Sequence, residues 1–183
     1  MKKYQIIYAD PPWRFKVWCR DTGLGRSADN HYPTMTIDEL KKLPIPSHEN
    51  CALFLWVTLP MLQEGLDLIK AWGFVYKTVA FTWVKRNKKA STWFWGMGYW
   101  TRANAELCLL AIKGNIRRKS RSVHQIIDTS ITIHSEKPAE VRNRIVKLMG
   151  DLPRIELFAR QKTEGWDVWG NEVKSDIDLL SLK

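Results

Sequence analysis

Short apolar runs alternate along the chain with stretches that have the period of an amphipathic helix. The runs are rich in aliphatic and aromatic residues and predict strands at 5–9, 51–58, 74–84, 106–112 and 154–160. The run at 51–58 is apolar at nearly every position, which is typical of a strand covered on both faces.

Three helices are predicted between these strands, over about 37–43, 60–72 and 138–149. Thr36 and Glu39 have the spacing of a capping box at the start of the first helix. In the second, Leu62, Leu66 and Ile69 share one side and are expected to face the core. Strands that alternate with helices indicate an α/β domain with a largely parallel sheet and helices on both faces.

The remaining segments are predicted loops, at 14–31, 85–102 and 114–125. No low-complexity linker and no second composition regime divides the chain. We therefore expect one domain over residues 1–172 and a C-terminal tail over residues 173–183.

The cysteine pattern and the length of the apolar runs argue against a disulfide-rich, zinc-binding or membrane-spanning protein. Cys19, Cys51 and Cys108 are odd in number and far apart, so neither a disulfide framework nor a zinc knuckle is expected. This usage favours a reducing, cytoplasmic location. No run of 18 apolar residues occurs, so no membrane-spanning segment is expected.

Positive charge is concentrated in one stretch of the sequence. The net charge is +10, yet residues 68–127 alone hold 12 Lys or Arg against one acidic residue, and the rest of the chain nets −1. Such a concentration predicts a surface that binds nucleic acid phosphates, with a solvated basic face as the alternative. The residues expected to contact phosphates are Lys85, Arg86, Lys88, Lys89, Arg117, Arg118, Lys119 and Arg121.

Tryptophan is the other unusual feature, with ten residues in the chain. Trp83, Trp93, Trp95 and Trp100 lie inside the basic stretch, where flat side chains beside cations suit stacking on unpaired bases. Most tryptophans fill cores, and Trp56 is expected to do so.

The sequence Asp10-Pro11-Pro12-Trp13 follows the first predicted strand and carries the clearest chemistry. An aminopurine NH2 group is a poor nucleophile because its lone pair is delocalised into the ring. The Asp10 carboxylate and the Pro11 carbonyl can accept its two hydrogens, and the prolines hold both oxygens in place. Trp13 offers a ring on which an extruded base can stack. The alternative is a strand-ending turn, for which Asp-Pro is common.

These four residues match the D-P-P-W motif of the N6-adenine methyltransferase family named for the large subunit of the eukaryotic mRNA adenosine methyltransferase. The resemblance covers Tyr4 to Glu172 and continues at 54–58, 72–74, 98–102, 106, 134–138, 153–160 and 165–172. It implies a Rossmann-like methyltransferase sheet with permuted motif order, in which the catalytic motif precedes the cofactor strand. Bacterial and phage members of that family act on DNA.

The family's methyl donor is S-adenosyl-L-methionine, and the resemblance implies which residues hold it. Lys137 pairs with the methionine carboxylate and Asp10 faces the ammonium group, unless Lys137 is an ordinary surface lysine. Phe158 packs on the adenosine, with core packing as its alternative. The other implied cofactor contacts are Glu156, Arg160, Asn171 and Glu172, with a surface turn after Gly170 as the alternative for the last two.

The residues expected beside the substrate base are Trp13, Tyr99, Glu106 and Ser135, with a structural salt bridge as the alternative for Glu106. The four histidines lack metal-ligand spacing, so no metal is expected. The sequence predicts S-adenosylmethionine-dependent methyl transfer to the N6 amine of a flipped-out adenine in DNA. The alternatives are an RNA N6-adenosine methyltransferase and a non-catalytic nucleic-acid-binding partner subunit. Analogy with the family also allows a homodimer.

Overall fold

The computed structural model describes residues 2–14, 34–98, 100–131 and 136–179, and its centre is a seven-stranded sheet of order β5-β3-β4-β2-β1-β6-β7. The strands are β1 (Tyr4–Ala9), β2 (Ser47–Val57), β3 (Val75–Arg86), β4 (Glu106–Lys113), β5 (Ile126–Ser130), β6 (Arg154–Leu157) and β7 (Asp167–Trp169). All neighbouring strands are parallel except that β4 is antiparallel to both β2 and β3. The six parallel strands therefore end at one common edge, which we call the carboxyl edge.

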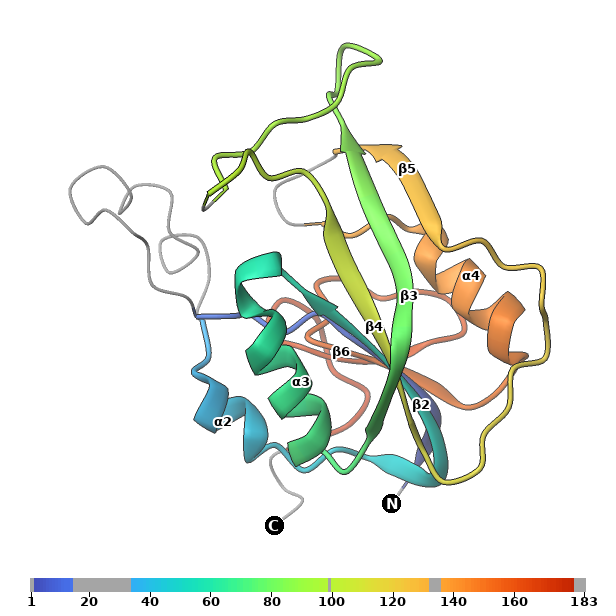
Figure 1. Cartoon of the computed structure of the whole chain (residues 1–183). Coiled ribbons are helices and arrows are strands. Elements are labelled where there is room, and N and C mark those ends of the chain that lie inside the picture. The colour runs from blue at the N-terminus through green and yellow to red at the C-terminus, as the bar shows by residue number, and fades with distance from the viewer. Residues whose placement is uncertain (1, 15–33, 99, 132–135, 180–183) are drawn as a thin grey trace.

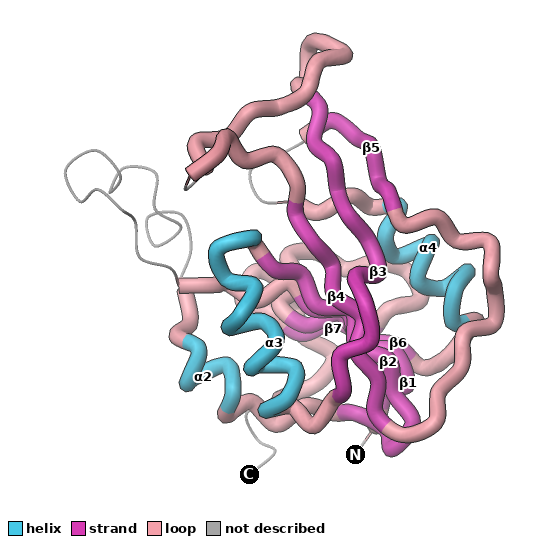
Figure 2. The backbone as a smooth tube through the Cα atoms, in the orientation of Figure 1, coloured by secondary structure: helices cyan, strands magenta, loops and turns pink. Residues whose placement is uncertain are grey.

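Helices cover both faces of this sheet (Figure 1). α2 (Ile37–Lys41) and α3 (Leu62–Ala71), the latter preceded by the 3-10 turn η3 (Leu59–Met61), lie on one face, and α4 (Glu140–Met149) lies on the other. Figure 2 shows the strands as a twisted layer between these helices. The predicted fold class, an α/β sheet with helices on both faces, is confirmed.

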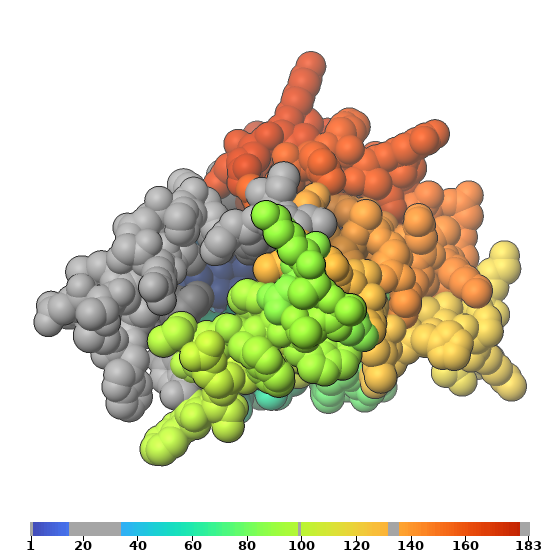
Figure 3. Space-filling model, turned by 90° about the horizontal axis from the view of Figure 1, so that it is seen from above, coloured from blue at the N-terminus to red at the C-terminus, as the bar shows by residue number. Residues whose placement is uncertain are grey.

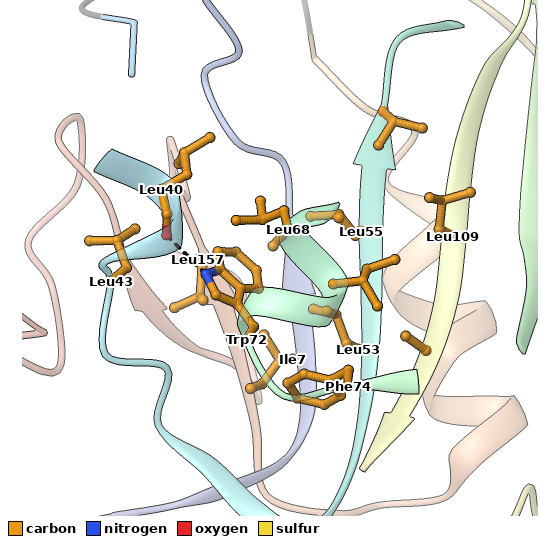
Figure 4. Packing of buried hydrophobic residues seen from close by; sticks show 14 of the residues in the cluster. Ile7, Leu40, Leu43, Leu53, Leu55, Leu68, Trp72, Phe74, Leu109 and Leu157 are labelled. Carbon is orange, nitrogen blue, oxygen red and sulfur yellow. Dashed lines mark hydrogen bonds between the residues drawn. The ribbon is translucent and has the colours of Figure 1, made fainter. Parts of the chain in front are cut away.

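Alternate residues of the central strands supply two cores, one on each face. Ile7 and Leu53 pack with α2 and α3, whereas Ile6 and Phe54 pack with α4. Figure 4 shows the first core, in which the indole N–H of Trp72 donates a 2.9 Å hydrogen bond to the carbonyl of Leu40. This bond ties the end of α3 to α2, because Leu40 belongs to α2.

The structure confirms one prediction about a single element and differs from others. The capping box of Thr36 and Glu39 is present at α2, as predicted. α3, however, buries Gly65, Leu68 and Ile69, while Leu62 is exposed, because Met61 of the preceding turn takes the buried place. β5 and β7 were not predicted, since each is short and carries few apolar residues.

Part of the predicted tail packs on the sheet. Leu179 is fully buried and Ile177 contacts the first core. The N–H of Asp176 donates to the carbonyl of Val168, and its carboxylate accepts from the N–H of the same residue, each over 2.9 Å. The division of the chain at residue 172 stays a prediction. No helix among the described residues is long and apolar enough to cross a bilayer.

Candidate active site

β1 ends at Ala9, and the backbone then turns sharply at the carboxyl edge. The N–H of Trp13 donates to the Pro11 carbonyl over 2.8 Å, which closes a three-residue turn centred on Pro12. The Pro12 carbonyl accepts from the N–H of Met35 over 2.9 Å, and this bond ties the motif to the segment before α2. The Pro11 oxygen is thereby fixed, and its second lone pair is left for another donor.

The ring of Trp13 is held inside the protein. Only 5% of the residue is exposed, and its indole N–H donates a 3.0 Å hydrogen bond to the Trp56 carbonyl. In this arrangement Trp13 fastens the motif to β2 and offers almost no free face to a base. The stacking role stays a prediction, and it requires the neighbouring groups to move.

A chain of alternating charges begins at Asp10. The Lys137 Nζ atom lies 2.7 Å from Asp10 Oδ2 and 3.2 Å from Glu106 Oε2. The other oxygen of Glu106 pairs with Lys85. Only 8% of the Lys137 side chain is exposed, so Lys137 is not an ordinary surface lysine. The salt-bridge alternative for Glu106 is confirmed, whereas its contact with a base stays a prediction.

Burial and pairing act in opposite directions on these groups. Burial raises the pKa of Asp10 above its usual value, although Lys137 opposes the rise. Burial would also raise the pKa of Glu106, but Lys137 and Lys85 outweigh it and hold that pKa below its usual value. Burial would lower the pKa of Lys137, but the two carboxylates raise it, so the ammonium stays charged. The pKa of Asp10 is therefore shifted upward and that of Glu106 downward, although both carboxylates bind the same lysine.

A cavity of about 180 Å³ lies at the ends of β1 and β6, and Asp10, Lys137 and Phe158 are among the residues that line it. Seen onto the carboxyl edge, Figure 3 shows a hollow with the N-terminal segment at its floor. Phe158 has a φ of 62°, a left-handed conformation that costs a non-glycine residue about 1–2 kcal/mol. Strain of this kind collects at functional sites, where the surrounding structure must hold it.

The end of β7 and the residue after it contact the loop that carries Phe158, which we call the strained loop. The N–H of Ala159 donates to the Trp169 carbonyl over 3.0 Å, and the rings of Phe158 and Trp169 meet edge to face with centroids 5.4 Å apart. A Cβ atom on Gly170 would lie 2.1 Å from the Ala159 carbonyl oxygen. Glycine at position 170 thus permits the close approach that positions Phe158.

Glu156 lines the cavity, but both of its carboxylate oxygens already bind Arg142, each over 2.6 Å. Burial raises the pKa of Glu156 even though Arg142 opposes the rise. The Arg142 guanidinium also lies over the ring of Tyr8, and both residues line the cavity. Sequence reasoning missed these two residues. The only available signal was an arginine beside the buried positions of the helix predicted at 138–149.

The mouth of the cavity carries an exposed ion pair between Arg160 and Glu172, with Nε 3.1 Å from Oε1. Asn171, which was expected to act together with Glu172, faces solvent. Tyr99 and Ser135, predicted beside the base, lie outside the described residues. Within the described parts of the chain, no three His, Cys, Asp or Glu residues are grouped so that they could hold a metal ion.

Two of the residues predicted to contact phosphates form ion pairs with carboxylates of the same protein. Lys85 is largely buried against Glu106. Arg86 binds Asp128 through Nε and Nη2, both over 2.6 Å, and its guanidinium lies 4.2 Å from the ring centroid of Trp93. Carboxylates of the same molecule already balance both charges, and the contact of Lys85 and Arg86 with phosphates stays a prediction.

The other predicted phosphate contacts lie near opposite edges of the sheet (Figure 1). Lys88 and Lys89 are exposed and follow β3 at the carboxyl edge. The loop 114–125 leaves β4 at the other edge, and the N–H of Lys119 donates to the Leu148 carbonyl near the end of α4. Since α4 begins just after Lys137, this loop lies about one helix length, roughly 16 Å, from that lysine. The exposed cations of the loop are Arg117, Arg118, Lys119 and Arg121.

The four tryptophans of the basic stretch differ in exposure, since one is buried and three are exposed. Trp83 is buried, so it is not free to stack on a base. Trp93, Trp95 and Trp100 are exposed on the loop that follows β3. Trp56 is fully buried, as predicted.

Comparison with known proteins places this arrangement among relatives. The model of the MT-A70 family matches residues 4–172. A Type II methyltransferase, M.MunI from a Mycoplasma species, is 38% identical over 190 residues, a match that covers 94% of this chain and 78% of that protein.

Longer eukaryotic proteins match as well. An N(6)-adenosine-methyltransferase MT-A70-like protein of Drosophila melanogaster is 30% identical, and the human N(6)-adenosine-methyltransferase catalytic subunit METTL3 is 29% identical, each over 176 residues. Both matches cover 93% of this chain. The chain spans only 27% and 28% of the length of these two relatives.

Proposed function

The chain belongs to the MT-A70 family of methyltransferases, and from this membership and the geometry after β1 we propose that it methylates the N6 amine of adenine in DNA. The observation that carries the proposal is the position of Asp10. Its carboxylate and the fixed Pro11 oxygen lie at the carboxyl edge, where α/β sheets bind their ligands. A cavity with charged and aromatic walls adjoins them.

Methyltransferases of this family generally use S-adenosylmethionine, and the residues around the cavity fit that molecule. Asp10 and Lys137 offer a carboxylate and an ammonium to the oppositely charged groups of an amino-acid zwitterion. Phe158 offers a ring to the adenine, and Glu172 offers an acceptor to the ribose hydroxyls. When it is bound, this cofactor supplies the methyl group.

The chain's own residues then act on the amine. Lys137 holds Oδ2 of Asp10, and among the described residues Oδ1 has no hydrogen-bond donor. Oδ1 and the Pro11 oxygen accept the two hydrogens of the amine, which raises the electron density on N6. Both oxygens are fixed before the substrate arrives, so no reorganisation is needed as charge develops. After transfer N6 carries one proton too many, and Asp10, whose pKa burial raises, is placed to accept it.

Charge supports a nucleic acid substrate, because the chain nets +10 and exposed cations lie on two loops. The high coverage of the Type II methyltransferase favours DNA. RNA is the second candidate, since the eukaryotic relatives are named as N(6)-adenosine methyltransferases.

The test incubates the protein with isotopically labelled S-adenosylmethionine and with DNA or RNA, followed by mass spectrometry of the nucleosides. Label in N6-methyldeoxyadenosine supports the proposal. Label only in N6-methyladenosine moves the substrate to RNA. Absence of label from both, in a preparation that binds the cofactor, contradicts methyl transfer to adenine.

A further inference from the structure

A groove of about 790 Å³ lies beside the D-P-P-W turn, and it shares no lining residue with the cavity at Asp10. Its walls come from segments that follow three different parallel strands. Thr36 and Ile37 lie beyond the motif after β1, Leu59 follows β2, and residues 100–104 belong to the loop after β3. The groove therefore opens at the carboxyl edge, and its size is that of an ordinary ligand site.

Backbone hydrogen bonds join the groove to the proposed reaction centre. The Pro12 carbonyl accepts from the N–H of Met35, and the Met35 carbonyl accepts from the N–H of Arg14 over 3.2 Å. Arg14 and Thr36, which flank this ladder, both line the groove. A ligand in the groove thus lies within a few residues of the oxygens that would receive the adenine amine.

The walls combine apolar surface with a few polar groups. Leu59, Pro60 and Met61 form one apolar side, while Glu64 and Arg102 supply charges. A nucleobase likewise has apolar faces and polar edges. Proteins recognise unpaired bases by stacking on the faces and by hydrogen bonds to the edges.

Trp100 stands on the wall formed by the loop after β3 and is 95% exposed. Its neighbours hold the turn that presents it. Gly98 has a φ of 67°, and a Cβ atom there would lie 1.9 Å from the Thr101 carbonyl oxygen, so the turn requires glycine. The N–H of Gly96 donates to the Ala103 carbonyl over 2.7 Å and closes the base of the turn. The described residues on both sides of position 99 are thus held in place, and the indole of Trp100 is exposed to solvent.

We propose that this groove binds the unpaired base next to the target adenine, stacked on Trp100. The inference rests on the proposed function, because extrusion of an adenine leaves its neighbour in the same strand partly unstacked. An exposed indole replaces the lost stacking, whatever the base. Lys88 and Lys89 are exposed on the same loop and supply the charge that a flanking phosphate needs.

The test measures binding of a fluorescently labelled 12-nucleotide single-stranded DNA with one central adenine among thymines. Single abasic sites are introduced at each position beside the adenine. We expect Trp100→Ala to weaken binding of the intact strand about tenfold, as loss of one stacked base does. One abasic position should weaken wild-type binding by a similar factor, and combining it with Trp100→Ala should cost little more than either change alone.

Met97→Ala is the matched control, since Met97 is 69% exposed on the same loop but does not line the groove. It should change binding less than twofold. An equal loss in this variant, a failure of wild type to bind the strand, or fully additive losses at every abasic position would overturn the inference.

Methyl transfer measured on the same strands separates this inference from the proposed function. If wild type methylates the adenine while no position couples to Trp100, the groove assignment fails and the proposed function stands. If the coupling is found without any methyl transfer, the proposed function fails and the groove still binds a base.

Discussion

Lys137 donates a hydrogen bond to Asp10 across 127 positions of the sequence, with its Nζ atom 2.7 Å from Oδ2. The packing of α4 on the sheet brings the two residues together, because Lys137 lies just before α4 and Asp10 just after β1. The bond engages one oxygen of the carboxylate. A single residue can therefore face the cofactor site with one oxygen and the substrate amine with the other.

Replacement of Asp10 by asparagine is expected to lower methyl transfer by about 100-fold or more, because an amide cannot match a fixed carboxylate as acceptor. The fold should survive, since the side chains are nearly the same size. Turnover with labelled cofactor and circular dichroism measure the two effects. Asp38→Asn, which changes an exposed carboxylate on α2, is the control and should keep full activity. Full activity in Asp10→Asn would remove Asp10 from the reaction.

The pH dependence tests the same residue through its neighbour. Asp10 acts as a carboxylate, so activity is lost as the pH falls through its pKa. Lys137 lowers that pKa against the effect of burial, and Lys137→Met should therefore raise it further. The acid limb of the pH profile, measured at saturating cofactor, is expected to move to higher pH. Lys137→Arg keeps the charge and should leave the limb near its wild-type position. An unmoved limb in Lys137→Met would contradict the coupling.

The sequence predicted the parts of the fold that local pattern encodes. Strong apolar runs located β1, β2 and β4, and a capping box located the start of α2. The turn chemistry of Asp10-Pro11-Pro12 likewise marked the candidate site. β5 and β7 escaped because they are held by pairing with β3 and β6, which a single-strand pattern does not contain.

Ion pairs between residues far apart in the sequence explain why the roles of several basic residues could not be predicted. Lys85 and Glu106 are 21 positions apart, and nothing local shows that they neutralise each other. The same holds for Arg142 and Glu156 on α4 and β6. The prediction that basic residues contact phosphates therefore rests on charge density alone. That criterion cannot separate a cation paired inside the protein from one that faces solvent.

The buried pair of Glu156 and Arg142 predicts a large loss of stability when it is broken. Arg142→Met leaves a buried carboxylate without its cation, and we expect a loss of about 3–5 kcal/mol in the free energy of unfolding at pH 7. Removing the cation raises the pKa of Glu156 further above its unfolded value. Between those two values the folded state binds more protons, so stability should recover as the pH falls. Chemical denaturation at several pH values measures this recovery.

The double variant Arg142→Met/Glu156→Gln is the control for that experiment. It removes the buried charge together with its partner, so it should be more stable than Arg142→Met at pH 7 and show little of the recovery at low pH. If the single and double variants are equally stable at every pH, the unpaired carboxylate is not the cause.

Charge reversal tests whether nucleic acid reaches the loop near the end of α4. A duplex rises about 3.4 Å per base pair, so roughly five base pairs span the 16 Å between Lys137 and this loop. Reversal of Arg117, Arg118 and Arg121 to glutamate is expected to weaken DNA binding and to flatten the salt slope by about two to three. Affinity measured at several salt concentrations gives the slope.

Lys70→Glu/Lys77→Glu changes exposed lysines of the same basic stretch that were not expected to contact phosphates, and it should alter the slope far less. Unchanged affinity in the triple variant would confine the phosphate contacts to the carboxyl edge, where Lys88 and Lys89 lie.

Gly170 offers a test of how the strained loop serves the cofactor site. A Cβ atom at this position meets the Ala159 carbonyl oxygen at 2.1 Å, so Gly170→Ala must push the turn away from the loop that carries Phe158. We expect a loss of about 1–3 kcal/mol in the free energy of unfolding, as overpacking usually costs, and weaker binding of S-adenosylmethionine in calorimetry.

Gly73→Ala is the matched control. Its φ of 79° makes alanine unfavourable by about 1–2 kcal/mol, but the space around it is open and it lies after α3, away from the cavity. The two variants should lose similar stability, and only Gly170→Ala should lose cofactor affinity. Equal affinity in both would show that the position of Phe158 does not depend on this contact.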